Sequence, residues 1–249
     1  MRLDKLLAHT GYGTRTEVKK LLKSKVVKVD GVIAKDAKQK VDLPQQVVTV
    51  FDEVVEYREF VYLMMNKPKN CLSATRDRDY RTVIDLLDEE YLLFDVAPAG
   101  RLDRDTEGLV LLTNDGKLAH EIISPKKDVF KRYVAHISGE LTEEAIHQLE
   151  VGVKILDGNN DTFLTKPAKV KVIGAIENLL AVEIWITEGK FHQVKRMFAS
   201  VGCKVEYLKR LAIGSLELDE TLALGEYREL TDQELSLLKV EANVLNKES

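Results

Sequence analysis

The chain has 249 residues, of which 45% are hydrophobic and 31% charged, so it is long enough for one or two globular domains. No apolar run approaches the roughly 18 residues of a membrane-spanning helix, and the N-terminus has no signal-peptide pattern, so we expect a cytoplasmic protein without a membrane partner. The formal net charge is −4, yet residues 1–40 carry 11 basic and 4 acidic side chains. This asymmetry argues against uniform coating of nucleic acid and is compatible with a local phosphate-binding module, although lysine-rich helix faces are usually just solvated.

Two short helices and a hairpin are predicted within residues 1–40. Thr14 and Glu17 have the spacing of a capping box, which places the start of the second helix. The apolar stripe of that helix leaves its lysines outside; these are Lys19, Lys20 and Lys23. The pair Asp30-Gly31, between two strand-like segments, is typical of a two-residue hairpin turn.

Residues 41–59 are polar and irregular, and we place a domain boundary near residue 58. Beyond it, strand-like and helix-like segments follow one another without a repeated period, which predicts an α+β domain around a mixed or antiparallel sheet. The expected strands are 60–66, 92–98, 108–113, 132–138, 168–174, 179–187 and the stretch 204–218. The expected helices are 82–87, 115–123, 143–150, 190–202 and 232–239. Thr231 and Glu234 have capping-box spacing for the last of these, and residues 242–249 are expected to be a disordered tail.

A polar loop lies between two apolar strands in residues 98–116, and such loops are common positions for functional sites. It contains Arg101, Asp103 and Asp105. The two carboxylates could form an acid–base pair or bind a metal, but side chains two residues apart need not converge. A solvated loop with local ion pairs is the alternative interpretation.

The segment 187–202 has helical periodicity. Its expected buried positions are Val194, Met197, Phe198 and Val201. His192 and Arg196 then point away from the core, while Lys195 lies at the edge of the buried stripe. Lys195 would therefore reach a partly buried carboxylate and Arg196 would reach water or phosphate; a solvated basic face is the alternative. His192 has no second histidine or cysteine nearby with which to bind a metal.

Two further pairs of residues carry weaker signals. Lys131 and Tyr133 lie on the same face of a predicted strand, where a tyrosine more often packs in the core or at an edge than stacks on a base. Cys71 and Cys203 form neither a disulfide framework nor a zinc set, and we expect both to be buried apolar residues.

Three of these segments together resemble the three ordered motifs of pseudouridine synthases, namely GRLDRDTEGLVLLTNDG, the Lys131–Tyr133 pair and EGKFHQVKRMF. The similarity is greatest to the branch that modifies ribosomal RNA and includes the small-subunit enzyme. Further segments that match this branch are 66–74, 82–87, 164–173 and 224–231. Residues 1–40 resemble the alpha-L RNA-binding module, which is also found in a small-subunit ribosomal protein and in tyrosyl-tRNA synthetases.

The resemblance covers nearly the whole chain in order and implies an α+β fold in three parts. Residues 1–58 would form the alpha-L RNA-binding domain. Residues 59–241 would form a pseudouridine-synthase domain with a mixed or antiparallel central sheet flanked by helices, and 242–249 the tail. The chain departs from many relatives at Asn70, where they have glycine; asparagine tolerates the left-handed turn expected there, so we expect no loss of function.

By the same resemblance, the protein isomerises a specific uridine of ribosomal RNA to pseudouridine, and the target of the small-subunit branch is uridine 516 of 16S rRNA. Asp103 would be the catalytic carboxylate, Tyr133 would stack on the uracil or receive a proton, and Lys195 would keep Asp103 ionised. The residues expected to contact RNA are Arg101, His192, Arg196, Arg15, Lys19, Lys20 and Lys23. No metal or other cofactor is required, and the expected partner of a monomeric enzyme is ribosomal RNA in a small-subunit assembly intermediate.

Several alternatives stay open at this point. Asp103 can act as a nucleophile or as a base on the ribose, and because sister branches carry arginine at the position of Lys195, Arg196 could be the partner of Asp103 instead. The target could be a uridine of the large-subunit RNA. From other classes, the chain could be a non-catalytic assembly factor, or a hydrolase that uses Asp103 and Asp105 to release uracil.

Overall fold

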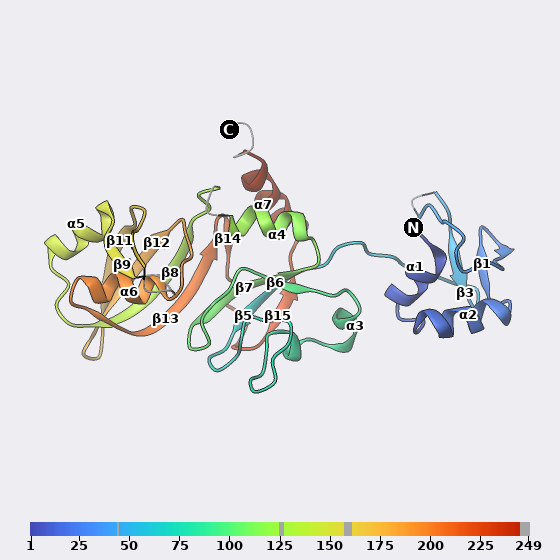
Figure 1. Ribbon diagram of the computed structural model, residues 1–249, viewed down its shortest axis with the longest axis horizontal. Coiled ribbons are helices and arrows are strands. Elements are labelled where there is room, and N and C mark those ends of the chain that lie inside the picture. The colour runs from blue at the N-terminus through green and yellow to red at the C-terminus, as the bar shows by residue number, and fades with distance from the viewer. Residues whose placement is uncertain (44, 125–126, 157–160, 245–249) are drawn as a thin grey trace. The chain divides into compact units, whose positions relative to one another are not determined.

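A computed structural model describes residues 1–43, 45–124, 127–156 and 161–244 of the chain (Figure 1). The chain divides into two compact units. One comprises Met1–Val61 with Leu87–Asp95, and the other comprises Tyr62–Leu86 with Val96–Ser249. None of the helices in the described part of the chain has the length and apolar composition needed to cross a lipid bilayer.

The first unit packs two helices against a small antiparallel sheet. The helices are α1 (Leu3–His9) and α2 (Arg15–Lys23), and the strands, in sheet order, are β2 (Val32–Ile33), β1 (Val27–Val29), β3 (Val48–Val50) and β4 (Glu53–Val54). The predicted capping box at the start of α2 is confirmed, because the backbone N–H of Thr14 donates to Glu17 at 2.7 Å and that of Glu17 donates back to Thr14 Oγ1 at 3.4 Å. Leu6, Val18 and Val27, all fully buried, belong to the core between helices and sheet.

The expectation of an irregular segment at 41–59 is wrong, since this segment contributes β3 and β4. Each strand is only two or three residues long, too short for an alternating pattern to stand out. Their pairing is long-range: β3 lies along β1, and the Asp30 carboxylate accepts hydrogen bonds from Val47 N at 2.9 Å and Gln46 Nε2 at 2.8 Å. Polar residues that look like linker in the sequence therefore hold the hairpin turn.

The second unit is built on one large sheet. Its strands, in order, are β11 (Lys169–Ile176), β12 (Leu179–Ile186), β8 (Lys131–Ser138), β13 (Lys204–Ile213), β7 (Glu107–Thr113), β5 (Tyr62–Lys67) and β15 (Tyr227–Glu229), with β6 (Ala97–Ala99) on β7 and β14 (Leu216–Glu217) on β13. All pairings are antiparallel except that of β7 with β13, so the sheet is mixed. The predicted α+β class is confirmed. Every residue of β7 is buried, as expected of a central strand.

Helices cover parts of this sheet. They are η1 (Ile84–Leu86), a 3₁₀ turn, and the α-helices α4 (Gly116–Ile123), α5 (Glu143–Val151), α6 (Gln193–Ser200) and α7 (Asp232–Val244); α3 (Glu89–Leu92) belongs to the first unit. Helices α4 and α7 lie side by side (Figure 1). Their buried Leu118, Ile122 and Leu238 pack with β5 and β7 residues in one core cluster. The predicted capping box before α7 is confirmed by Thr231 N donating to Glu234 Oε2 at 2.8 Å.

Several predicted boundaries differ from the structure. The strand expected at 92–98 begins only at Ala97, and the helix expected at 82–87 is a single 3₁₀ turn. The helix expected at 190–202 spans only Gln193–Ser200. The hairpin of β9 (Lys154–Leu156) and β10 (Thr162–Leu164) and strand β15 were not predicted, because three-residue strands carry too little periodicity. Helix α7 continues to Val244, and residues 245–249 of the predicted tail lie outside the described residues.

Gly108, at the start of β7, allows the single parallel pairing of the sheet. Its φ is +102°, and a Cβ added there would lie 2.2 Å from the backbone oxygen of Arg210 on β13. Only glycine tolerates both the left-handed conformation and the close backbone approach. The loop that precedes β7 is therefore held against β13 by this residue.

We predict that Gly108→Ala destabilises the second unit by on the order of 3 kcal/mol, because the substitution adds both backbone strain and a steric clash. Urea unfolding followed by the fluorescence of Trp185, the one tryptophan of the chain, measures this unit. Gly116→Ala is the matched control, because a Cβ there meets nothing within 4 Å and φ is not positive; it should change stability by less than about 1 kcal/mol. Equal effects of the two substitutions would contradict the role assigned to Gly108.

Candidate active site

The loop between β6 and β7 presents Asp103, and hydrogen bonds from other segments fix its backbone. Ser73 Oγ accepts from Leu102 N at 3.1 Å and donates to Leu102 O at 3.2 Å. Thr106 N donates to Asp103 O at 3.1 Å, which closes a turn directly behind the carboxylate. Leu102, which directly precedes Asp103, is thus tied to a segment about 30 positions earlier in the chain.

A fully buried lysine supports the same loop from β5. Lys67 Nζ donates to the backbone oxygens of Thr106 at 2.7 Å, Pro68 at 3.0 Å and Arg104 at 3.4 Å. Burial lowers the pKa of Lys67 to about 8, since the ammonium loses its hydration and the nearby negative charges only partly offset that loss. Asn70 N also donates to Arg104 O at 2.8 Å, and its φ of 60° is the left-handed turn expected there.

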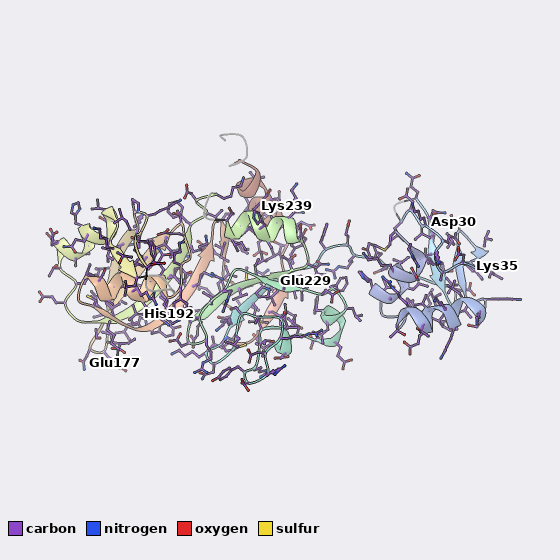
Figure 2. The ribbon with its side chains drawn as sticks, in the orientation of Figure 1. Asp30, Lys35, Glu177, His192, Glu229 and Lys239 are labelled. Carbon is purple, nitrogen blue, oxygen red and sulfur yellow. The ribbon has the colours of Figure 1, made fainter. Side chains whose placement is uncertain are left out.

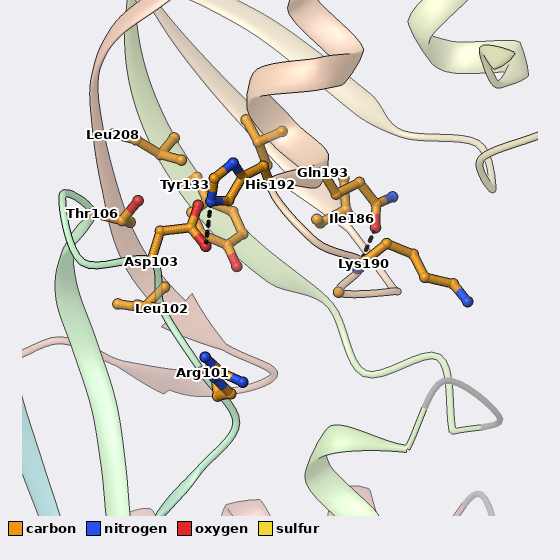
Figure 3. Close-up of a pocket in the computed structure, with 12 residues that line it drawn as sticks. Arg101, Leu102, Asp103, Thr106, Tyr133, Ile186, Lys190, His192, Gln193 and Leu208 are labelled. Carbon is orange, nitrogen blue, oxygen red and sulfur yellow. Dashed lines mark hydrogen bonds and ion pairs between the residues drawn. The ribbon is translucent and has the colours of Figure 1, made fainter. Parts of the chain in front are cut away.

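Asp103 lies in a pocket (Figure 3). Its lining residues are Arg101, Leu102, Asp103, Thr106, Tyr133, Ile186, Gly189, Lys190, His192, Gln193, Val194 and Leu208. They come from the 101–106 loop, from β8, β12 and β13, and from the start of α6. Two of the three predicted catalytic residues, Asp103 and Tyr133, therefore share one pocket, and Tyr133 is only 7% exposed.

Two side chains from the α6 region face Asp103. His192 Nε2 lies 3.7 Å from Asp103 Oδ1, and Lys195 Nζ lies 3.5 Å from Oδ2. Lys195 also donates a shorter hydrogen bond, 2.6 Å, to Asp105 Oδ1, so its ammonium lies between the two carboxylates. Burial acts to raise the pKa of Asp105, but the hydrogen bond and charge of Lys195 outweigh it and leave that pKa below its usual value.

Arg196 has different partners. Its Nη1 donates to Leu156 O at 2.5 Å, and its guanidinium lies over the ring of Phe191, 4.9 Å from the centroid. Phe191 in turn stacks on His192 with ring centroids 3.8 Å apart. Arg196 thus has partners within the protein that the sequence did not predict, and its expected contact with phosphate stays a prediction. Of the two cations considered as partners of Asp103, the structure brings Lys195 to it.

The predicted face of α6 is largely present. Val194, Met197 and Phe198 are buried and Lys195 lies at the edge of the buried stripe, whereas Val201 lies beyond the helix end and is half-buried. Arg101 lines the pocket and is exposed. Tyr133 lines the pocket, whereas Lys131 does not. The ammonium of Lys131 is buried and donates to Val129 O at 3.0 Å and Thr187 O at 3.4 Å.

The basic residues of α2 belong to the first unit. Arg15, Lys19, Lys20 and Lys23 are all exposed there. Lys19 and Lys23 line a surface hollow to which three further lysines contribute, and these are Lys25, Lys35 and Lys38. Figure 2 marks Lys35 on this unit. Sequence reasoning did not single out these three, because they lie outside the helix whose periodicity drew attention to the others.

Sequence reasoning also missed the residues that shape the turn before α6. The side chain of Gln193 is buried; its Oε1 accepts from Lys190 N at 2.8 Å and its Nε2 donates to Glu188 Oε1 at 2.7 Å. These bonds hold the turn that carries His192, whose φ is 51°. Only the glutamine in an otherwise basic and apolar segment could have signalled this.

Among the described residues, no group of three or more histidine, cysteine, aspartate or glutamate side chains is placed to hold a metal ion. Cys71 and Cys203 are free and buried, as predicted.

Comparisons with known proteins find similar families and chains. The model of the RNA pseudouridylate synthase family matches residues 61–200, and that of the S4 domain matches residues 1–48. A Bacillus subtilis protein named uncharacterized RNA pseudouridine synthase YtzG is 54% identical over 96% of this chain and 98% of its own length. The ribosomal small subunit pseudouridine synthase A of Salmonella typhimurium is 39% identical over 95% of this chain and 99% of its own length. A solved structure described as a crystal structure of pseudouridylate synthase is 38% identical in sequence, with a TM-score of 0.64. The alignment covers 96% of this chain and 99% of that one.

The buried ammonium of Lys67 predicts a pH dependence of stability. Lys67 releases its proton near pH 8 in the folded protein and near 10.5 in the unfolded chain, so between these values the unfolded chain binds more protons and the free energy of unfolding rises with pH. Lys67→Met removes this rise, which amounts to about 3 kcal/mol at 1.4 kcal/mol per pKa unit.

Urea unfolding of the wild type and of Lys67→Met at pH 8 and pH 10.5, followed by Trp185 fluorescence, measures the difference. Relative to Lys67→Met, the free energy of unfolding of the wild type should be about 3 kcal/mol higher at pH 10.5 than at pH 8. The exposed Lys69 provides the control, and Lys69→Met should behave as the wild type does. A gap that is the same at both pH values would contradict a charged amine at this buried position.

Proposed function

Because the chain belongs to the RNA pseudouridylate synthase family, we propose that it isomerises a uridine of ribosomal RNA to pseudouridine, with uridine 516 of 16S rRNA as its target and Asp103 as its catalytic carboxylate. The identity of 39% to a ribosomal small subunit pseudouridine synthase A over nearly the full length of both chains supports the choice of RNA. The observation that carries the chemistry is the Asp103 carboxylate in a pocket with Tyr133, within 4 Å of Lys195 and His192.

The reaction breaks the glycosidic bond, turns the uracil and rejoins it through carbon 5, and one ionised carboxylate suffices for it. As a nucleophile, Asp103 bonds to the ribose carbon while the glycosidic electron pair leaves with the uracil. As a base, it takes a ribose proton while the same electron pair leaves. Both routes begin with ionised Asp103, whose carboxylate is 26% exposed and has the ammonium of Lys195 at 3.5 Å.

The pocket walls keep the freed uracil in place. Leu102, Ile186 and Leu208 supply apolar surface, and the nearly buried ring of Tyr133 supplies a flat one on which a base can stack. A base released into this pocket remains beside the ribose for the second bond to form.

The target base must leave its stack to enter the pocket, at a cost of a few kcal/mol that is least in a bulge or single strand. Exposed Arg101 at the pocket is placed to contact the phosphate backbone or the gap that the flipped base leaves. The lysines of the first unit supply charge for affinity, since phosphate contacts dominate the binding of RNA. The substrate that we propose is rRNA in a partly assembled small subunit, where such a segment is accessible.

The target is tested by pseudouridine mapping of ribosomal RNA from cells that lack this protein. We expect one pseudouridine of 16S rRNA, at 516, to be missing and to return with the wild-type gene but not with Asp103→Asn. Loss of a modification in the large-subunit RNA instead would move the target to that subunit. An unchanged map would contradict the proposed activity and favour a non-catalytic assembly factor.

The role of Asp103 is tested with purified enzyme. Asp103→Asn should abolish tritium release from rRNA labelled at uracil carbon 5 under single-turnover conditions, because an amide neither attacks nor accepts the proton. RNA binding should stay within a few-fold of the wild type, since the substitution removes no phosphate contact. Appreciable turnover by this variant would assign the chemistry to another residue. Free uracil among the wild-type products would identify a hydrolase.

The first unit is tested through the lysines of its surface hollow. Lys19→Gln combined with Lys23→Gln should weaken rRNA binding and reduce the slope of log K against log salt by about 0.7–0.9 for each phosphate that the protein no longer neutralises. Lys171→Gln with Lys239→Gln, exposed lysines of β11 and α7, makes the same charge change elsewhere and should leave the slope unaltered. Identical slopes for both double variants would show that the hollow does not bind the RNA.

A further inference from the structure

Asp105 is a carboxylate that the proposed chemistry does not use, yet its ion pair with Lys195 is shorter than either ion pair of Asp103. Lys195 Nζ lies 2.6 Å from Asp105 Oδ1 and 3.5 Å from Asp103 Oδ2. Asp105 is 67% exposed, Asp103 26% and Lys195 23%. One ammonium is thus shared between a sheltered carboxylate in the pocket and a solvated carboxylate two residues further along the same loop.

The other charged and titratable groups around the two carboxylates come from several elements. Asp103 is faced by His192 at 3.7 Å from the start of α6, and the pocket also presents the phenol of Tyr133 from β8. The cations that line the same pocket are Arg101 and Lys190. Behind the loop, the buried amine of Lys67 on β5 interacts electrostatically with both carboxylates. Among the described residues, Lys195 is the one whose side chain forms ion pairs with both carboxylates.

Asp103 loses its negative charge during the reaction by either route, because it becomes an ester or an acid. Lys195 then loses one of its two counter-ions while its ammonium remains largely sheltered. An ammonium without a partner in such surroundings is costly. Asp105, which is solvated and keeps its charge through the reaction, is the group that limits this cost.

We propose that Asp105 is a positioning residue that holds the ammonium of Lys195 between the two carboxylates and keeps it paired when Asp103 loses its charge. This inference rests on the proposed function, because it concerns the same reaction. Without Asp105, Asp103 becomes the single carboxylate partner of Lys195. The ionised form of Asp103 is then held more tightly, and each step that neutralises it becomes slower.

The test compares pH–rate profiles of single-turnover tritium release for Asp105→Asn and Lys195→Met. The two substitutions should move the acidic limb in opposite directions: Asp105→Asn to lower pH, because a neighbouring negative charge is lost, and Lys195→Met to higher pH, because a positive charge is lost. Asp105→Asn should also lower kcat about tenfold near neutral pH while KM for the RNA stays within about threefold. Asp105→Glu, which keeps the charge, should restore most of kcat.

Asp128→Asn is the matched control, since Asp128 is another exposed aspartate that pairs with a lysine, Lys166 at 2.5 Å, outside the pocket. It should leave both kcat and the acidic limb unchanged. An acidic limb that stays in place or rises in Asp105→Asn would overturn the inference, as would an unchanged kcat. A rise in KM alone would mean that Asp105 contacts RNA instead. Wild-type enzyme that forms no pseudouridine would contradict the proposed function itself, whereas active wild type with an unaffected Asp105→Asn would overturn this inference alone.

Discussion

The site depends on a buried ammonium that must find its hydrogen-bond partners inside the protein. Lys67 lies at the end of β5 with its side chain fully buried, and the cost of removing an amine from water is offset only when carbonyl groups converge on it. Those carbonyls belong to Pro68, Arg104 and Thr106. Because Arg104 and Thr106 lie on the loop 101–106, a movement of this loop would leave the ammonium of Lys67 without two of its hydrogen-bond acceptors. The position of Asp103 is therefore a consequence of satisfying Lys67.

Backbone constraints complete this arrangement from the other side. The parallel pairing of β7 with β13 brings the two backbones so close that position 108 must be glycine. Ser73 ties Leu102 to a third segment of the chain. The loop 101–106 is thus fixed at both ends, and its exposed residues are Arg101, Arg104 and Asp105. A carboxylate held in this way needs little reorganisation to meet a substrate, which is the advantage of a preorganised site.

Basic side chains from the α6 region face the Asp103 carboxylate. Lys195 faces both Asp103 and Asp105, and Gln193 holds the turn through which His192 reaches the same pocket. The rest of the lining combines apolar and aromatic side chains with the cations Arg101 and Lys190. The site thereby combines a sheltered surface with a local balance of charge, and the exposed lysines of the hollow belong to the other unit of the chain.

Features that depend on neighbours a few residues apart could be predicted from the sequence. The capping boxes at Thr14 and Thr231, the buried face of α6 and the polar loop around Asp103 all follow from local spacing, and they appear in the structure. Which distant groups meet could not be predicted, because this depends on the packing of the folded chain. The pairing of β3 with β1, the carbonyls around Lys67 and the sharing of Lys195 between two carboxylates join segments up to 90 residues apart. No periodicity records such contacts, because they arise from the packing of the whole sheet rather than from the preferences of any one segment.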